Sequence, residues 1–269
     1  MTGESNYEEG RYLYCIVNCS RKTDFGHTGI EDNFVYTVPF NDIGAVVHSC
    51  GAKPYKTEDK EKAVEWILAH QYVIDQATGE FGTAIPLTFD TIFKGRNETV
   101  KKWLNEEYQQ LKALLAKLEG KAEYGVQIFV DYDAVNKTVE DNEEIQTLKR
   151  KLENTSSGAA YLFSKQLEKR IRLEKEVSTS KYAEELYHQI KELVDDVKLE
   201  SAKREVPEKW KGKHMILNLV CLMHKEKLEN LGKVLEGFKK EGFAVRFTGP
   251  WPPYSFVEKI RESRTEESW

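Results

Sequence analysis

The chain has 269 residues, of which 40% are hydrophobic and 32% are charged, and its formal net charge is −5. This apolar content is enough to build cores, which excludes wholesale disorder. The negative net charge argues against nucleic acid as a partner, because phosphate binding needs a clustered positive field.

Membrane insertion and secretion are not expected either. No stretch approaches the ~18 apolar residues that a membrane helix needs. The first residues, Met1–Gly10, are polar and acidic and lack the apolar region of a signal peptide. We therefore expect a cytoplasmic protein.

Strands and helices alternate in the first part of the chain. Residues 11–19, 33–50 and 82–93 are rich in β-branched and aromatic residues and predict extended chain, with residues 33–50 forming two strands broken near Pro39 and the Asn41–Asp42 pair. Two amphipathic helices are predicted. The first is capped by Thr57 and stopped at Gly79, and the second is capped by Asn97, has an apolar stripe from Val100 to Leu118 and is closed by Gly120. The apolar face of the first helix is expected to contain Ala63, Trp66, Ile67, His70, Val73, Ile74 and Ala77.

The remaining chain begins with a predicted strand and then changes in composition. Residues 123–131 predict the strand, and residues 133–208 are charge-dense and mostly helical. Residues 215–223 are apolar on both faces except for Asn218, which predicts a central strand. An amphipathic helix ended by Gly242 and a strand over 243–247 follow. Within the charged region, one helical stripe comprises Tyr182, Leu186, Ile190, Leu193 and Val197.

These patterns predict an α+β protein of two small domains, residues 1–120 and 121–269. Each is expected to have an antiparallel or mixed sheet with helices on one face. The second domain would include the helical segment 133–208 and a terminal segment, 248–256. The 133–208 region could form an antiparallel hairpin that exposes its apolar stripe, but we favour packing of the stripe on the second sheet.

The segment Thr248–Phe256 holds three prolines and three aromatic residues in nine positions. Each proline lacks a backbone N–H and restricts the residue before it, so the segment must be a stiff, extended arm that cannot join the middle of a sheet. Its aromatic rings could form a lid on the protein's own core or a ledge for a partner, and both roles can hold at once. The candidate partner-binding residues are Pro250, Trp251, Pro252, Pro253, Tyr254 and Phe256.

Reactive chemistry has little support. The six histidines show no metal-binding spacing, and the Cys221–His224 pair has no further ligands near it in the sequence. The four cysteines are interpreted as small buried residues, and the chain has no phosphate-binding or nucleophile motif. Glu123, at a strand start, is expected to pair with a basic residue or to cap backbone N–H groups. We expect no enzyme activity, no catalytic residue, no metal and no cofactor.

Five stretches in order resemble the GvpL/GvpF gas vesicle family. The match extends from Arg11 to Phe256, and each motif is weak alone but specific in this order. Two positions depart from the family pattern: Cys15 stands where a glycine is common, and Asp90 replaces a glycine, which puts the local backbone geometry there in question. The stretches are RYLYCIV (11–17), AIPLTFDTIF (84–93), LEGKAEYGVQIFVD (118–131), SSGAAYLFSK (156–165) and TGPWPPYSF (248–256).

The resemblance implies ferredoxin-like units and a role in gas vesicle formation. It implies a minor structural component or assembly factor that binds the hydrophobic shell subunit, with other gas vesicle accessory proteins as further partners. An acidic body that offers apolar and aromatic contact surfaces fits such a role. The alternative is a ligand-binding regulatory protein with ferredoxin-like domains, which fold alone does not exclude.

Overall fold

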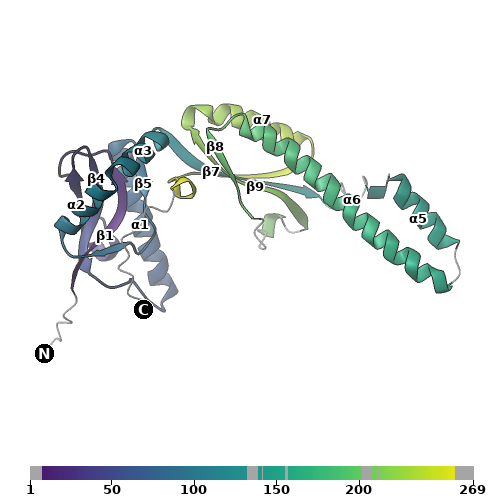
Figure 1. Ribbon diagram of the computed structural model, residues 1–269, viewed down its shortest axis with the longest axis horizontal. Coiled ribbons are helices and arrows are strands. Elements are labelled where there is room, and N and C mark those ends of the chain that lie inside the picture. Colours follow the sequence, from purple (N-terminus) through teal and green to yellow (C-terminus); the bar gives the residue numbers. More distant parts are fainter. Residues whose placement is uncertain are drawn as a thin grey trace. The chain divides into compact units, whose positions relative to one another are not determined.

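The computed structural model describes residues 8–131, 139–140, 142–154, 157–201, 208–210 and 212–257 (Figure 1). The described residues within Met1–Glu123 and Pro250–Trp269 form one compact unit, and those within Tyr124–Gly249 form a second. We expected the whole of segment 248–256 in the second domain. Its residues from Pro250 onward instead group with the first unit, where Ser255 bonds to Glu123.

The sheet of the first unit is antiparallel and centred on β1. The strand order is β2-β3-β4-β1-β5, and β6 also pairs with β1. Every residue of β1 after Glu9 is buried, so both faces of the strand are covered. The strands are β1 (Glu9–Val17), β2 (Asp24–His27), β3 (Phe34–Phe40), β4 (Ile43–Gly51), β5 (Ala84–Pro86) and β6 (Ile92–Lys94).

Helices cover both faces of this sheet, which corrects the expectation of helices on one face. Consecutive residues of a strand point to opposite faces. In β1, Arg11 bonds to Asn97 of α2, whereas its neighbour Tyr12 bonds to His70 of α1. A strand that is apolar on both faces needs cover on both, which is the physical reason for the difference. The helices are α1 (Lys60–Phe81), α2 (Asn97–Glu106), α3 (Tyr108–Leu118) and the short 3-10 helix η1 (Ile30–Asp32).

Two details of the first unit differ from the sequence prediction. The expected single helix over 97–118 is divided at Glu107, whose backbone has φ −97° and ψ 6°. The cap of α1 is Asp59, which accepts hydrogen bonds from the backbone N–H groups of Glu61 and Lys62. Thr57 lies two residues earlier, and its hydroxyl accepts a hydrogen bond from the backbone N–H of Asp59. The succession of elements also differs from the β-α-β-β-α-β succession of a ferredoxin-like unit.

The second unit has the succession β-α-β-β-α-β, counting α5 and α6 as one helical stretch, and the strand order β10-β7-β9-β8. The central place of β9 confirms the prediction from its two apolar faces. The ferredoxin-like arrangement stays a prediction for this unit. Its elements are β7 (Lys121–Asp131), α5 (Glu143–Glu153), α6 (Ser157–Lys191), β8 (Asp196–Leu199), η2 (Glu208–Trp210), β9 (Lys213–His224), η3 (Lys225–Lys227), α7 (Leu228–Lys240) and β10 (Ala244–Trp251).

The long helix α6 packs with its C-terminal half in the core of the second unit. Leu186 and Ile190 are buried, and α6 contacts β9 and α7, as we expected for the apolar stripe. The stripe is shorter than predicted, because the helix ends at Lys191 and Val197 belongs to β8. The N-terminal half of α6 lies beside α5 (Figure 1). Parts of the predicted 133–208 region lie outside the described residues.

Candidate partner-binding site

The terminal segment is an edge strand that ends in a 3-10 turn. The strand β10 ends at Trp251 and lies at one edge of its sheet. A proline is tolerated at an edge strand, because its missing N–H removes no hydrogen bond between interior strands. Gly249 has φ +115°, a conformation that side chains other than glycine rarely adopt. The turn η4 (Tyr254–Phe256) follows, with the Phe256 N–H donating to the carbonyl oxygen of Pro253 at 3.1 Å.

Glu123 holds this turn in place. One carboxylate oxygen accepts a hydrogen bond from the backbone N–H of Ser255 at 2.8 Å, and the other accepts from the Ser255 hydroxyl at 3.0 Å. This is one of the two roles that we expected for Glu123, the capping of backbone N–H groups. Two of the recognised stretches, 118–131 and 248–256, therefore meet in the folded chain although Ser255 follows Glu123 by 132 residues.

The predicted partner-binding residues divide into buried and exposed members. Phe256 is 1% exposed and Pro253 is buried, whereas Trp251 is 51% exposed. Pro250 and Tyr254 are also exposed, and Pro252 is intermediate. The C-terminal end of the segment therefore packs into the protein, whereas Trp251 and Tyr254 stay exposed, and the role of these two rings in partner binding stays a prediction.

Replacing Glu123 by alanine is expected to loosen this turn. Hydrogen bonds to a charged group contribute about 1.5–3 kcal/mol each, so we expect the free energy of local opening at the Ser255 amide to fall by about 2 kcal/mol. Hydrogen exchange of that amide measures the change. Glu119→Ala, which removes an exposed carboxylate at the end of α3, is the matched control. Unchanged exchange in Glu123→Ala would show that the pair does not hold the turn.

A second candidate contact surface lies on α1 and was not predicted. Four apolar residues, Val64, Ile67, Leu68 and Tyr72, are between 51% and 62% exposed. Their spacing of three and four residues places them side by side along one face of the helix. We had assigned Ile67 to the buried face, but the buried residues of α1 are Trp66, His70, Val73, Ile74 and Ala77. The available signal was the second apolar series at positions 64, 68 and 72, outside the predicted core stripe.

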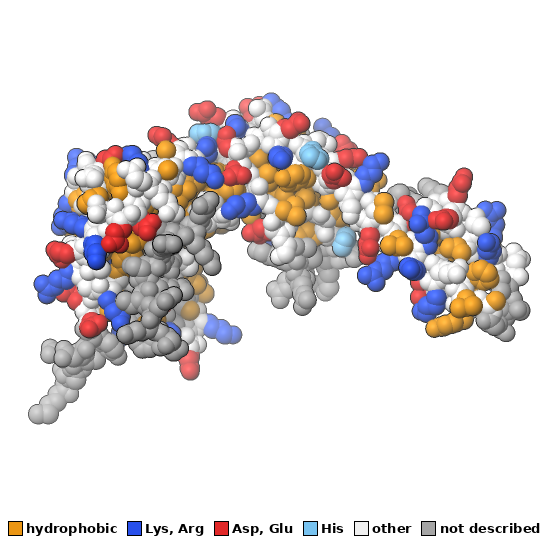
Figure 2. Space-filling model, in the orientation of Figure 1, with side chains coloured by type: hydrophobic (Ala, Val, Ile, Leu, Met, Phe, Trp, Pro, Cys, Tyr) orange, Lys and Arg blue, Asp and Glu red, His pale blue; other side chains and the backbone are white. Residues whose placement is uncertain are grey.

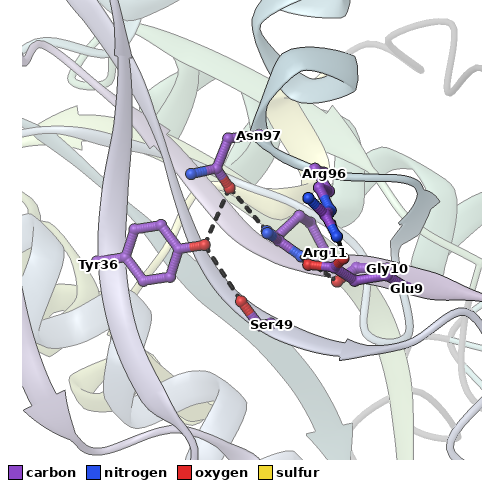
Figure 3. Close-up of polar contacts among 7 residues, drawn as sticks. All are labelled: Glu9, Gly10, Arg11, Tyr36, Ser49, Arg96 and Asn97. Carbon is purple, nitrogen blue, oxygen red and sulfur yellow. Dashed lines mark hydrogen bonds and ion pairs between the residues drawn. The ribbon is translucent and has the colours of Figure 1, made fainter.

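A cluster of polar side chains joins β1, β3 and α2 (Figure 3). The buried Arg11 guanidinium donates to Asn97 Oδ1 at 2.7 Å and to Glu9 Oε1 at 2.9 Å, and the Tyr36 hydroxyl donates to the same Asn97 oxygen at 2.9 Å. Arg96 donates to the second oxygen of Glu9 at 2.6 Å. The two guanidinium groups hold the pKa of the Glu9 carboxyl below its usual value. Because these side chains bond to one another, we interpret the cluster as a structural contact between the three elements.

The described residues offer little support for metal or thiol chemistry. In the parts of the chain that the structure describes, no three histidine, cysteine, aspartate or glutamate side chains come together as a metal site. The four cysteines are free thiols. Burial raises the pKa of Cys221 to about 12 and that of Cys50 to about 11, and it also raises the pKa of Cys15. Thiols with raised pKa values are poor nucleophiles at neutral pH.

Comparison with known proteins decides the family. The sequence model of the family "Gas vesicle synthesis protein GvpL/GvpF" matches residues 10–258. The chain belongs to the GvpL/GvpF family. Gas vesicle protein L1 of Halobacterium salinarum is 32% identical over 263 residues, which cover 96% of this chain and 93% of the relative. Gas vesicle protein L of Haloferax mediterranei is 29% identical over 291 residues, covering 96% and 90%.

Two solved structures have the same fold. The gas vesicle protein GvpF of Anabaena sp. PCC7120 aligns with a TM-score of 0.72 and 20% identity over 93% of this chain and 98% of that one. GvpF of Microcystis aeruginosa aligns with a TM-score of 0.64 and 17% identity, over 93% and 99%. The chain is therefore a mixed α+β gas vesicle protein, of a family that is not known for enzymatic activity. No helix in the described parts has the length and hydrophobicity needed to cross a bilayer.

Asp90, which replaces a glycine of the GvpL/GvpF pattern, keeps a glycine-like backbone. Its φ is +70°, in the left-handed region that glycine adopts without strain. Its N–H donates to the Tyr12 hydroxyl at 3.1 Å, and its carboxylate accepts from the backbone N–H of Tyr55 at 2.9 Å. Aspartate tolerates this region because its short side chain bonds locally. Asp90 therefore adopts a positive φ of the kind that a glycine at this position would allow.

Proposed function

We propose that this chain is a non-enzymatic minor structural component or assembly factor that binds the hydrophobic shell subunit while gas vesicles form. In this proposal it is a cytoplasmic protein that associates with gas vesicles and also contacts other accessory proteins of the vesicle. The observation that carries the proposal is the exposed apolar face of α1, formed by Val64, Ile67, Leu68 and Tyr72.

An exposed apolar face on an acidic protein fits a partner that is itself strongly apolar. Contiguous apolar patches on soluble proteins mark interaction sites more often than scattered single residues do. Charged side chains of both signs are spread over the face shown in Figure 2, with several apolar areas between them. A helix that presents neighbouring side chains at spacings of three and four residues is also the usual form in which an amphipathic helix meets a partner's apolar surface.

The terminal segment would supply a second contact. Trp251 and Tyr254 are exposed, and large aromatic side chains with few rotatable bonds are frequent anchors of protein interfaces. The buried members, Pro253 and Phe256, would hold these rings in place rather than touch the partner. Four of the six predicted residues are therefore proposed to form two pairs with different roles.

Leu68→Glu tests the α1 face. A charge in the middle of the face would be buried without a partner on binding, so we expect recovery of the shell subunit with the tagged chain to fall at least tenfold, which corresponds to about 1.4 kcal/mol. The measurement is co-purification of the shell subunit after co-expression. Because Leu68 is 62% exposed, the thermal unfolding midpoint should change little.

The matched control is Val177→Glu, which places the same charge on an exposed apolar position of α6. It should leave recovery of the shell subunit unchanged. Equal loss in both variants, or no loss in Leu68→Glu, would remove α1 as the contact surface.

A further inference from the structure

A cavity of about 550 Å³ lies in the first unit, between the end of β4 and the first turns of α1. This volume is within the range of ~300–1,000 Å³ that small-molecule sites occupy in proteins. It suits a small ligand rather than the face of a folded partner. Its lining residues include Glu31, Cys50, Tyr55, Lys62 and Trp66, together with Lys53 and Lys56 of the loop between them.

The described lining of the cavity has more basic than acidic side chains although the protein is acidic. Among the described lining residues there are three lysines and one glutamate, and Lys62 pairs with Glu31, which leaves Lys53 and Lys56 as the additional basic groups of a chain of net charge −5. A cleft with one sign of charge concentrates field lines and raises the local concentration of oppositely charged molecules. A local field that opposes the charge of the whole chain favours an anion at this place.

Two aromatic rings form a fixed wall of the cavity. The rings of Tyr55 and Trp66 meet edge to face, with centroids 5.2 Å apart. Tyr55 is held at both ends, because its hydroxyl bonds to His48 Nε2 at 3.0 Å and its backbone N–H donates to Asp90. The ammonium group of Lys62 lies 5.0 Å from the centroid of the Trp66 ring, so cationic and aromatic groups are already combined at the cavity.

The lining of the cavity also includes a residue with backbone strain. Glu31 and Asp32 have φ of +55° and +60°, two successive residues other than glycine in the left-handed region. Such residues cost about 1–3 kcal/mol each and cluster at functional sites. The strained turn directs Glu31 toward α1, where its carboxylate pairs with Lys62 at 3.1 Å. The turn therefore sets the position of one of the lysines that line the cavity.

We propose that this cavity binds a small organic anion, whose phosphate or carboxylate groups meet Lys53, Lys56 and Lys62 and whose planar part lies against Tyr55 and Trp66. This site is separate from the α1 face proposed for the shell subunit, and it adds a ligand-binding activity to that function. Adenosine triphosphate is a suitable probe, because it combines a polyanion with a planar ring.

Cys50 provides a reporter inside the cavity. The other three cysteines, Cys15, Cys19 and Cys221, are buried, whereas Cys50 is partly exposed and lines the site. Thiol labelling of the full-length chain at pH 8.5 should therefore modify Cys50 first, slowly because burial raises its pKa to about 11. A bound ligand that covers Cys50 should slow labelling about tenfold when its concentration is ten times its Kd.

Three probes distinguish the parts of the ligand. We expect adenosine triphosphate to protect Cys50, inorganic triphosphate to protect it more weakly, and neutral adenosine not to protect it. Lys53→Gln combined with Lys56→Gln should abolish protection, whereas Lys22→Gln, at an exposed lysine of the same unit outside the cavity lining, should leave it intact.

Several outcomes would overturn the inference: no protection by either anion, equal protection by adenosine, or protection by an acidic peptide alone. The Leu68→Glu variant separates this site from the proposed function. Loss of shell-subunit recovery with intact Cys50 protection would leave the anion site standing, and the reverse result would leave the shell contact standing.

Discussion

Phe256→Ala is expected to lower the free energy of unfolding of the first unit by about 3–5 kcal/mol, the range for removal of a buried phenylalanine side chain. Trp251→Ala, five residues earlier in the same segment, is expected to change it by less than about 1 kcal/mol. The difference follows from their environments, because Phe256 is 1% exposed and Trp251 is 51% exposed.

Hydrogen exchange of the β1 amides measures this difference directly, since β1 is the central buried strand of the first unit. It also avoids the assumption that a chain of two compact units unfolds in one step. A cost in Trp251→Ala as large as that in Phe256→Ala would show that Trp251 belongs to the core and would remove it as a partner contact. A cost below about 1 kcal/mol in Phe256→Ala would contradict the role of the segment as a part of the first unit's core.

The contrast between these two residues also explains what the sequence could predict about this segment. Three prolines fix the backbone, so the extended path and the edge position of the strand could be predicted from local chemistry. Which ring is buried depends on where Glu123 holds Ser255, a contact between residues 132 positions apart. Local patterns contain no information on that distance, so the division into buried and exposed rings needed the structure.

The α1 face shows a second limit of sequence reasoning. The periodicity of α1 predicted the buried Trp66, His70, Val73, Ile74 and Ala77, because the core side of a helix recurs every three to four residues. The same rule assumes that the remaining sides are polar. Val64, Leu68 and Tyr72 break that assumption, and a helix that is apolar on two sides gives no local signal of which side faces the sheet.

Acid is expected to destabilise the first unit through two buried histidines. His48 and His70 lie in the core, and burial lowers the pKa of each to about 4 from the ordinary value of 6.5. Because the Leu87 carbonyl oxygen can only accept, the His70 Nε2–H donates to it at 3.1 Å, which leaves Nδ1 to accept from the Tyr12 hydroxyl at 2.8 Å. A proton on Nδ1 would reverse this bond, because Nδ1–H would then donate to the Tyr12 oxygen, and it would place a positive charge in the buried core.

His48 is held in the same neutral form. Its Nδ1 and Nε2 lie 2.7 Å and 3.0 Å from the hydroxyl groups of Tyr14 and Tyr55, and the Tyr14 hydroxyl also accepts the backbone N–H of Ile30. These phenols carry no charge at neutral pH, and burial raises their pKa values further. Burial raises the pKa of the nearby Asp90 carboxyl, so the folded chain takes up this proton at a higher pH than the unfolded chain does, and Asp90 acts in the opposite sense to the histidines.

The direction of the pH effect follows from proton binding. Between pH 6.5 and about 4, the unfolded chain binds protons at both histidines and the folded chain does not, so the free energy of unfolding falls as the pH falls. At pH 5 the loss is about 2 kcal/mol for each histidine and about 4 kcal/mol for the pair, relative to pH 7.5. This loss is measured by urea unfolding of the first unit at several pH values, with hydrogen exchange of the β1 amides as the readout.

His70→Gln should remove about half of this pH dependence, because glutamine can still donate to the Leu87 carbonyl oxygen but does not titrate. His27→Gln is the matched control, since His27 is an exposed histidine of the same unit and its replacement should leave the pH dependence unchanged. If His70→Gln retained the full loss of stability between pH 6.5 and 4, the titration of His70 would not be its cause. The acid sensitivity would then arise at other groups, and the paired tyrosine and histidine side chains of the core would be only a packing arrangement.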